Sequence, residues 1–256
     1  IMFIRLPNGL IDGADHFTHV RIGELLGRQQ NYLTNKELVS GNIGHIPRIL
    51  EDLIKSIETE TGLTWQGNIK DAIQKLSAGD LETILLKIRE NTYGPKYYHE
   101  AICSHCEAKN KDLRVDLDKL ELTIMPVSEI MDTKKFTTML PKTGQEVELK
   151  PLYLKDLFSA IKMISGKQDE LITTTLALSI KRLGTKTKIT PQDLEDMPVS
   201  DIMFLSEFSE KLVLEGNIDL NMTTDCTECK KEFSYKLNVY DPSFFFPTKV
   251  YKSTST

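Results

Sequence analysis

Two short motifs, Cys103-Ser104-His105-Cys106 and Cys226-Thr227-Glu228-Cys229, contain all four cysteines of this 256-residue chain. A CxxC turn places two thiolates on one side of a tight loop, and two facing turns complete a tetrahedral four-sulfur shell for Zn²⁺. Cysteines that all fall into CxxC pairs in a cytosolic protein indicate metal binding rather than disulfides. We therefore expect one structural zinc ion per chain, bound by Cys103, Cys106, Cys226 and Cys229.

The residues around both motifs alternate between apolar and polar types, as β-strands with one buried face do. The apolar positions are Leu113, Val115 and Leu117 after the first motif and Ile218, Leu220, Met222, Phe233, Tyr235 and Leu237 around the second. Strand, CxxC turn and strand, twice over, is typical of a zinc ribbon. A thioredoxin-like redox motif would need a helix after the CxxC, and a disulfide within each CxxC would be strained. Both alternatives are weaker, although the gap between the motifs is long for a compact ribbon.

Internal similarity accounts for that gap. Leu6-Pro7-Asn8-Gly9 in the first half corresponds to Leu140-Pro141-Lys142-Thr143-Gly144 in the second, and each is followed by an extended stretch and a helix. Asp80–Leu86 corresponds to Asp201–Leu205 in the same way. We therefore predict a first helix-plus-CxxC-hairpin repeat at residues 1–125, a second at residues 126–247 and a flexible tail at residues 248–256.

The predicted fold class is α+β, mostly helical and internally duplicated, with the two CxxC β-hairpins joined as a zinc ribbon. Apolar residues spaced by three and four predict helices over Ile46–Ile57 and, less regularly, Glu170–Leu183. Ser77 and Asp80 resemble a capping box at the start of another helix, which Gly94-Pro95 ends. Pro198 begins the equivalent helix in the second half.

The composition is that of an ordinary globular protein, with 40% apolar and 27% charged residues. The 32 basic and 37 acidic side chains give a net charge of −5, which makes a general nucleic-acid binder an unfavourable interpretation. The sequence contains no apolar run of the roughly 20 residues that would cross a bilayer. The N-terminus is too short and too early broken by Pro7 to act as a signal peptide. We expect a protein of the host cytoplasm with no membrane partner.

No catalytic motif is recognisable, so we expect no enzymatic activity. His16 and His19 could be metal ligands, but scattered surface histidines are far commoner. Phe244-Phe245-Phe246 cannot all face one core from a single strand. This leaves two equal alternatives, a contact with a partner protein and a terminal segment packed on the chain's own core. The glycine-containing segment Asn8–Phe17 is predicted to be a second contact element, as a long polar loop.

A resemblance to a known family rests mainly on Ile84–Pro95 (ILLKIRENTYGP) and on Tyr97–Cys106 (YYHEAICSHC). With Leu6-Pro7 and the late Cys226-Thr227-Glu228-Cys229, these segments resemble the T-even-type tailed-phage (myovirus) baseplate hub family, which includes hub assembly proteins. The resemblance implies a non-catalytic virion or assembly protein with other phage tail and baseplate proteins as partners. It also implies a place in the host cytoplasm during assembly or in the tail baseplate of the virion.

Two functions are therefore weighed. The first is a zinc-stabilised baseplate hub component or hub assembly factor that acts through protein–protein contacts. The alternative is a zinc-ribbon binding module of a transcription or replication complex, which would require a basic face. Only short clusters, Lys109 with Lys111 and Lys230 with Lys231, lie beside the cysteines. An electrophoretic shift with nucleic acid at moderate salt separates the two, because only the second requires binding.

Overall fold

Helices and strands occur in nearly equal amounts in this protein. The computed structural model describes residues 1–29, 46–130, 136–164, 171–213 and 216–245. About 36% of the chain is helical and about 34% is strand, arranged in several small antiparallel sheets. The prediction of a mostly helical chain is therefore wrong, although both CxxC hairpins form. None of the described helices is long and apolar enough to cross a membrane.

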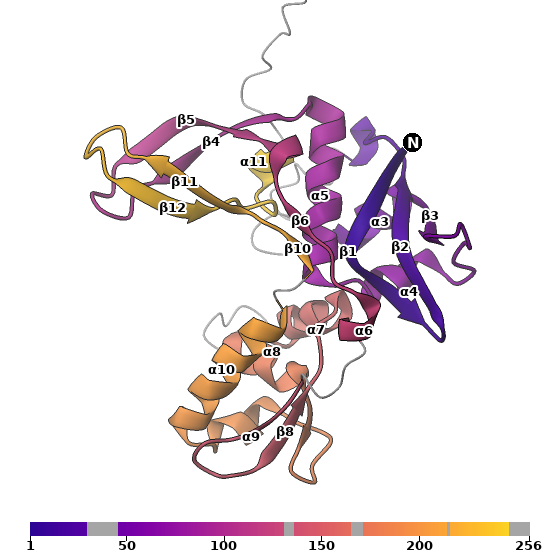
Figure 1. Cartoon of the computed structure of the whole chain (residues 1–256), viewed down its shortest axis with the longest axis vertical. Coiled ribbons are helices and arrows are strands. Elements are labelled where there is room, and N and C mark those ends of the chain that lie inside the picture. Colours follow the sequence, from indigo (N-terminus) through magenta and orange to yellow (C-terminus); the bar gives the residue numbers. More distant parts are fainter. Residues whose placement is uncertain (30–45, 131–135, 165–170, 214–215, 246–256) are drawn as a thin grey trace, which may run out of the picture.

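The first part of the molecule packs a three-stranded antiparallel sheet, in the order β1-β2-β3, against three helices (Figure 1). Its elements are β1 (Met2–Asp12), β2 (Asp15–Ile22), α3 (Ile46–Leu53), β3 (Ile54–Thr59), α4 (Ile69–Gln74) and α5 (Ala78–Tyr93). Helix α5 is the centre of this part, since Leu81, Ile84 and Leu86 are fully buried in the main core. Ser77 and Asp80 form the predicted capping box, and Gly94 is the C-cap.

The second part has its own smaller core. A sheet in the order β7-β8-β9 packs with helices around Leu149, Leu176 and Leu205. Its elements are α6 (Val127–Ile130), β7 (Thr137–Met139), β8 (Glu146–Leu149), α7 (Leu154–Ile164), α8 (Leu171–Ser179), β9 (Ile180–Leu183), α9 (Pro191–Glu195) and α10 (Val199–Val213). In Figure 1 this part lies below the first one.

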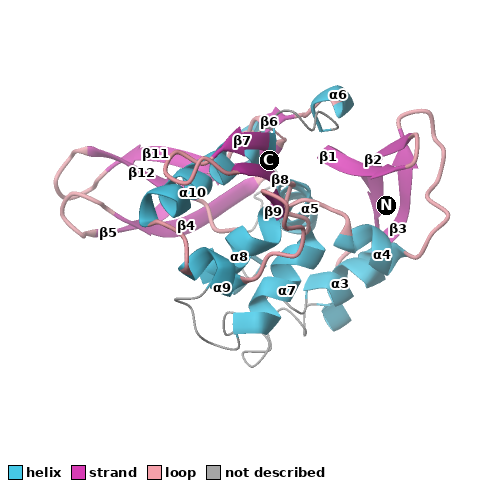
Figure 2. Cartoon of the chain, turned by 90° about the horizontal axis from the view of Figure 1, so that it is seen from below, coloured by secondary structure: helices cyan, strands magenta, loops and turns pink. Residues whose placement is uncertain are grey.

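Two β-hairpins project together from the side of the first part that faces away from β1–β3 (Figures 1 and 2). The first consists of β4 (Lys96–Ile102) and β5 (Lys109–Asp116), and the second of β11 (Asn221–Asp225) and β12 (Glu232–Lys236). Short elements join them to the body: η2 (Leu117–Lys119), β6 (Leu122–Thr123), β10 (Asn217–Ile218) and α11 (Pro242–Phe245). Strand β6 pairs with β10, so segments from both halves of the chain meet beneath the hairpins.

Two predicted helices are longer than the helices observed, for the same physical reason. The apolar spacing of Ile46–Ile57 continues without a break, but the helix ends at Leu53 and Ile54 begins strand β3. Helix α8 likewise ends at Ser179, and Ile180 begins β9. In each case the next strand follows with no intervening loop, so no glycine or proline marks the change. Pairing of β3 with β2 and of β9 with β8 decides the conformation, which local propensity cannot anticipate.

Two buried aspartates hold the Leu-Pro turns of the two halves in the same way. The Asp80 carboxylate accepts hydrogen bonds from the backbone N–H groups of Asn8 (2.9 Å) and Gly9 (3.0 Å). The Asp201 carboxylate accepts equivalent bonds from Lys142 (2.8 Å) and Thr143 (3.1 Å). Both carboxyl groups lie near the start of the long helix that precedes a CxxC hairpin, α5 or α10, and both residues are fully buried.

We keep the division into repeats at residues 1–125 and 126–247 as a proposal, which these paired features support. The two sheets have the same strand order, and their third strands follow a helix directly. The repeats would not be independent bodies, because Ile218, Leu237 and Phe244 of the second belong to the main core of the first. The predicted tail at residues 248–256 lies outside the described residues.

Candidate metal centre

The four cysteines meet at the tips of the two hairpins. The Sγ atoms of Cys103 and Cys229 are 3.8 Å apart, and those of Cys106 and Cys226 are 3.6 Å apart. All four sulfur atoms lie within 4.8 Å of one another. A tetrahedral zinc ion with Zn–S bonds of about 2.3 Å would hold its sulfur ligands about 3.8 Å apart. The donor set and its spacing are therefore compatible with a four-thiolate metal site.

Both knuckles have the same backbone hydrogen bonds. In the first, the Glu107 N–H donates to Cys103 O (2.9 Å) and the Cys103 N–H to Ala108 O (2.9 Å). In the second, the Lys230 N–H donates to Cys226 O (3.1 Å) and the Cys226 N–H to Lys231 O (3.0 Å). The two turns therefore have the same backbone hydrogen-bond pattern, and the pair of thiols in each turn faces the other hairpin.

Each knuckle also contains one residue in the left-handed conformation that glycine usually supplies. Glu107 and Lys230 both have φ of 59°. A side chain in this conformation costs about 1 kcal/mol. The same strain at equivalent positions indicates that closure of the four-sulfur cluster, rather than local preference, fixes these turns.

The surroundings of Cys226 favour its thiolate. Backbone hydrogen bonds from Cys229 and then from Glu228 lower the pKa of the Cys226 thiol to about 6. Cys226 is buried, so these N–H groups replace water in stabilising a negative charge on sulfur. A thiolate is the form in which cysteine binds a metal.

Asn110 connects the two knuckles from behind the cluster. This fully buried side chain accepts hydrogen bonds at Oδ1 from the Thr227 N–H (2.7 Å) and the Thr227 hydroxyl (3.0 Å). Its Nδ2 donates to Cys226 Sγ at 3.6 Å and to Ala108 O at 3.1 Å. A residue of β5 in the first hairpin therefore orients the Cys226 thiol of the second. No sequence pattern predicts this role, because asparagine in a strand is not a recognisable motif.

Apolar contacts support the base of the cluster. Phe233 stands four residues after Cys229, as Asn110 stands four after Cys106, and it is buried against Cys103 and Cys226. Tyr235 continues this contact towards His99, with ring centroids 5.1 Å apart. Burial lowers the pKa of His99, so this imidazole is neutral between the hairpins. Asn110 and Phe233 thus occupy equivalent positions in the two hairpins.

We expect Asn110→Ala to weaken zinc binding by 10- to 100-fold, the usual loss when a group that orients a metal ligand is removed. Competition with a chelating dye measures the affinity. Asn221→Ala is the matched control, because its exposed side chain bonds only to Asp219 nearby. Equal zinc affinity of Asn110→Ala and the unaltered protein would contradict a role for Asn110 at the metal.

The histidines considered as ligands lie elsewhere. His16 Nε2 is 2.6 Å from Asn8 O, and His19 stacks on Phe3 with ring centroids 4.7 Å apart. Among the described residues, the four cysteines form the cluster with metal-ligand spacing. His105 lies on the exposed tip of the first knuckle, where its Nε2 is 2.9 Å from Glu232 O.

The predicted contact elements need correction. Phe244 and Phe245 are buried in the chain's own core, so the interpretation of these two as an exposed partner contact is wrong. They belong to the helical turn α11, where successive side chains point about 100° apart, and both can be buried. Phe246 lies outside the described residues. The segment Asn8–Phe17 is also not a loop, because β1 and β2 pair as a hairpin over most of it.

The comparison with known families matches most of the chain. The family described as T4 bacteriophage base plate protein matches residues 21–246. No curated protein and no solved structure matches the chain. The match includes both CxxC hairpins and the whole of the second core, so the resemblance noted from the α5 and β4 sequences extends over both parts of the fold. The chain belongs to the T4 bacteriophage base plate protein family.

Proposed function

We propose that this protein is a non-catalytic component or assembly factor of the baseplate hub, stabilised by one structural zinc ion and acting through contacts with other tail proteins. The observation that carries the proposal is the family match over residues 21–246. Membership in a baseplate family supports contacts with other phage tail proteins and a place in the tail of the virion. The hub position is the finer part of the proposal and rests on the likeness of Ile84–Cys106 to hub proteins.

The geometry of the hairpins supports the zinc part of the proposal. Four thiols approach within bonding reach of one ion, and beside them Cys103, Cys226 and Phe233 form a small buried cluster between the hairpins. Structural zinc sites of four cysteines leave no open position for a substrate or water. The role of such an ion is to hold two chain segments together, which suits a rigid component of an assembly.

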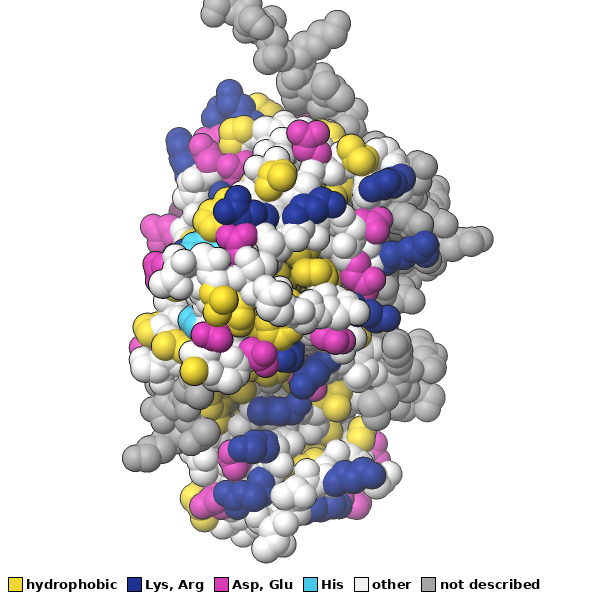
Figure 3. All heavy atoms as spheres, turned by 90° about the vertical axis from the view of Figure 1, so that its right-hand side faces the viewer, with side chains coloured by type: hydrophobic (Ala, Val, Ile, Leu, Met, Phe, Trp, Pro, Cys, Tyr) yellow, Lys and Arg dark blue, Asp and Glu magenta, His cyan; other side chains and the backbone are white. Residues whose placement is uncertain are grey.

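The charge distribution favours protein partners over nucleic acid. On the face seen in Figure 3, lysine and arginine side chains are interspersed with aspartate and glutamate. Several basic side chains of the described residues form ion pairs, among them Arg182 with Glu148 (3.5 Å) and Lys150 with Asp156 (2.8 Å). A phosphate-binding surface needs unpaired clustered cations.

Complementation of a phage that lacks the gene tests the proposal. Without the protein, we expect tails that fail at baseplate assembly, and with it we expect infectious particles. Image analysis of the incomplete baseplates should show material missing at the centre if the hub assignment is correct and at the periphery if it is not. Complete baseplates in the absence of the protein would refute the structural role itself.

A further inference from the structure

A pocket of about 190 Å³ lies where the two parts of the molecule meet. Its base is formed by the turn of β1 and the first residues of α5, and Pro151–Lys155 of the second part close its other side. The lining residues are Asn8, Gly9, Ile11, Lys75, Ser77, Ala78, Gly79, Met125, Ile130, Phe136, Pro151, Leu152, Tyr153 and Lys155. Both repeats therefore contribute to one cavity.

The two parts are held in register beside this pocket by a few specific bonds. The Leu154 N–H donates to Leu76 O at 2.8 Å. The Asn8 amide donates to Ser77 Oγ (2.8 Å) and to Gly216 O (2.6 Å). Gly216 is the first described residue after α10. A molecule bound here would contact both parts at once and add to this small set of bonds.

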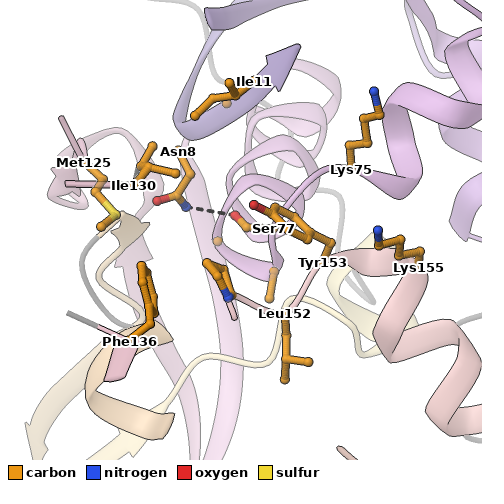
Figure 4. A pocket seen from close by; sticks show the side chains of 14 residues that line it. Asn8, Ile11, Lys75, Ser77, Met125, Ile130, Phe136, Leu152, Tyr153 and Lys155 are labelled. Carbon is orange, nitrogen blue, oxygen red and sulfur yellow. Dashed lines mark hydrogen bonds between the residues drawn. The ribbon is translucent and has the colours of Figure 1, made fainter. Parts of the chain in front are cut away.

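The walls of the pocket differ in character. Figure 4 shows Met125, Ile130 and Phe136 on one side and Lys75 and Lys155 on the other. A cavity of about 150 Å³ lined by apolar side chains is large enough to bind benzene. One aromatic side chain therefore fits the space beside Met125 and Phe136.

The lysine side of the pocket carries two ammonium groups, those of Lys75 and Lys155. None of its described lining residues is acidic. The Lys75 ammonium group forms an ion pair with the Asp12 carboxylate at 3.1 Å. The Lys155 ammonium group lies 5.8 Å from the centre of the Tyr153 ring and has no carboxylate within 4.0 Å among the described residues. The Asp80 carboxyl group is fully buried and bonded to Asn8, Gly9 and Ser77. The pocket thus offers an apolar surface next to the ammonium group of Lys155, which has no ion-pair partner among the described residues.

We propose that this pocket binds an aromatic side chain with an adjacent carboxylate, presented by a neighbouring baseplate protein, and that this contact locks the two parts of the chain together. The inference rests on the proposed function, because it names the contact through which an assembly component would act. The aromatic ring occupies the Met125 and Phe136 side, and the carboxylate faces Lys155. Burial of one aromatic anchor in a pocket with a charged rim is the usual form of a hot spot.

A small probe tests the site directly in the full-length zinc-bound protein. N-acetyl-L-phenylalanine carries both the ring and the carboxylate, and its amide derivative lacks the charge. We expect saturable shifts of the backbone amide signals of Ile11 and Gly79 in ¹⁵N spectra with the acid, and affinity about fivefold weaker with the amide, the effect of one exposed ion pair. Equal affinity of the two probes, or shifts that do not saturate, would overturn the proposal.

Variants test whether the binding is in this pocket. Ala78 lines it at the first position of α5, so Ala78→Phe fills the cavity, and Ala78→Ser is the control that does not. Lys155→Glu should remove the preference for the acid, whereas Lys188→Glu, an exposed lysine in the same part of the chain, should not. Retained zinc content and thermal unfolding show that each variant is folded. If Ala78→Phe does not fold, the comparison of Lys155→Glu with Lys188→Glu decides the test. An unchanged preference of Lys155→Glu for the acid then refutes the site.

Phage complementation separates this inference from the proposed function. We expect Ala78→Phe and Lys155→Glu to fail, while Ala78→Ser and Lys188→Glu restore infectious particles. If the gene proves dispensable for baseplates, the proposed function is wrong whatever the probe does. If the gene is required but all four variants restore infectivity, the pocket has no role as a docking site and only the inference drawn here falls.

Discussion

Cys226→Ser is expected to abolish zinc binding and to unfold the paired hairpins. Structural zinc contributes about 10–16 kcal/mol to the folding of small zinc-finger peptides, and three remaining thiols leave an open, weaker site. Even part of that contribution is comparable to the 5–15 kcal/mol by which whole domains are stable. Elemental analysis should fall from one zinc per chain to well below one. Hydrogen exchange should become fast in β4, β5, β11 and β12.

The first control is a substitution in the other knuckle, and the second is removal of the metal from the unaltered protein. Ser104→Ala changes the exposed tip of the first knuckle and should leave zinc content and exchange unchanged. Removal of the metal by a chelator should make the unaltered protein behave like Cys226→Ser, whose own behaviour should not respond to the chelator. If hairpin exchange is slow in Cys226→Ser, the hairpins are held by their apolar contacts and the ion is not structural. A zinc content of zero or two per chain in the unaltered protein would reject the site as described.

The hairpins could be predicted from the sequence because their signal is chemical and local. Cysteine at both ends of a four-residue turn has few uses in a reducing compartment, and alternating apolar residues beside it define a strand on each side. Four ligands in two pairs then require the pairs to meet, whatever separates them in the chain. The four cysteines lie together as predicted. That these four thiols bind an ion, and that the ion is zinc, are proposals.

The elements that were misread lack such a signal. Ile54 and Ile57 continue the apolar spacing of α3, and only pairing with β2 makes them a strand. The pair Phe244 and Phe245 looked too crowded for burial because a strand geometry was assumed. In a helical turn their rings pack edge to face, with centroids 5.2 Å apart, and Phe244 also contacts Tyr97. In both places the sequence pattern predicts one conformation, and tertiary contacts impose the other.

Only part of the role of Asp80 can be predicted from the sequence. Its place three residues after Ser77 predicts a capping box, which is present. Its bonds to Asn8 and Gly9 could not be predicted, because nothing in the sequence links positions so far apart. Burial raises the pKa of Asp80, and the hydrogen bonds from Asn8, Ser77 and Gly9 oppose that rise. The buried carboxyl group therefore has hydrogen-bond donors at both of its oxygens.

Asp80→Ala should be strongly destabilising. It removes a fully buried acceptor that serves two turn N–H groups and the Ser77 N–H (3.0 Å) and hydroxyl (2.7 Å). A buried donor left without a partner costs about 1–3 kcal/mol, and loss of a helix cap costs about 1 kcal/mol. We expect a loss of about 3–5 kcal/mol in the free energy of unfolding and a fall of roughly 10 °C in the melting temperature. Calorimetry measures both.

Asp193→Ala is the matched control for this effect, because Asp193 closes a similar box. Its carboxylate accepts from the Thr190 N–H (2.8 Å) and hydroxyl (2.8 Å) at the start of α9. It is partly exposed, however, and its further partner is the ammonium group of Lys186 rather than a distant turn. Water replaces these bonds when the side chain is removed, so Asp193→Ala should shift the melting temperature far less than Asp80→Ala. Similar shifts for both variants would mean that capping alone accounts for Asp80, and that its bonds to Asn8 and Gly9 add nothing to the stability of the fold.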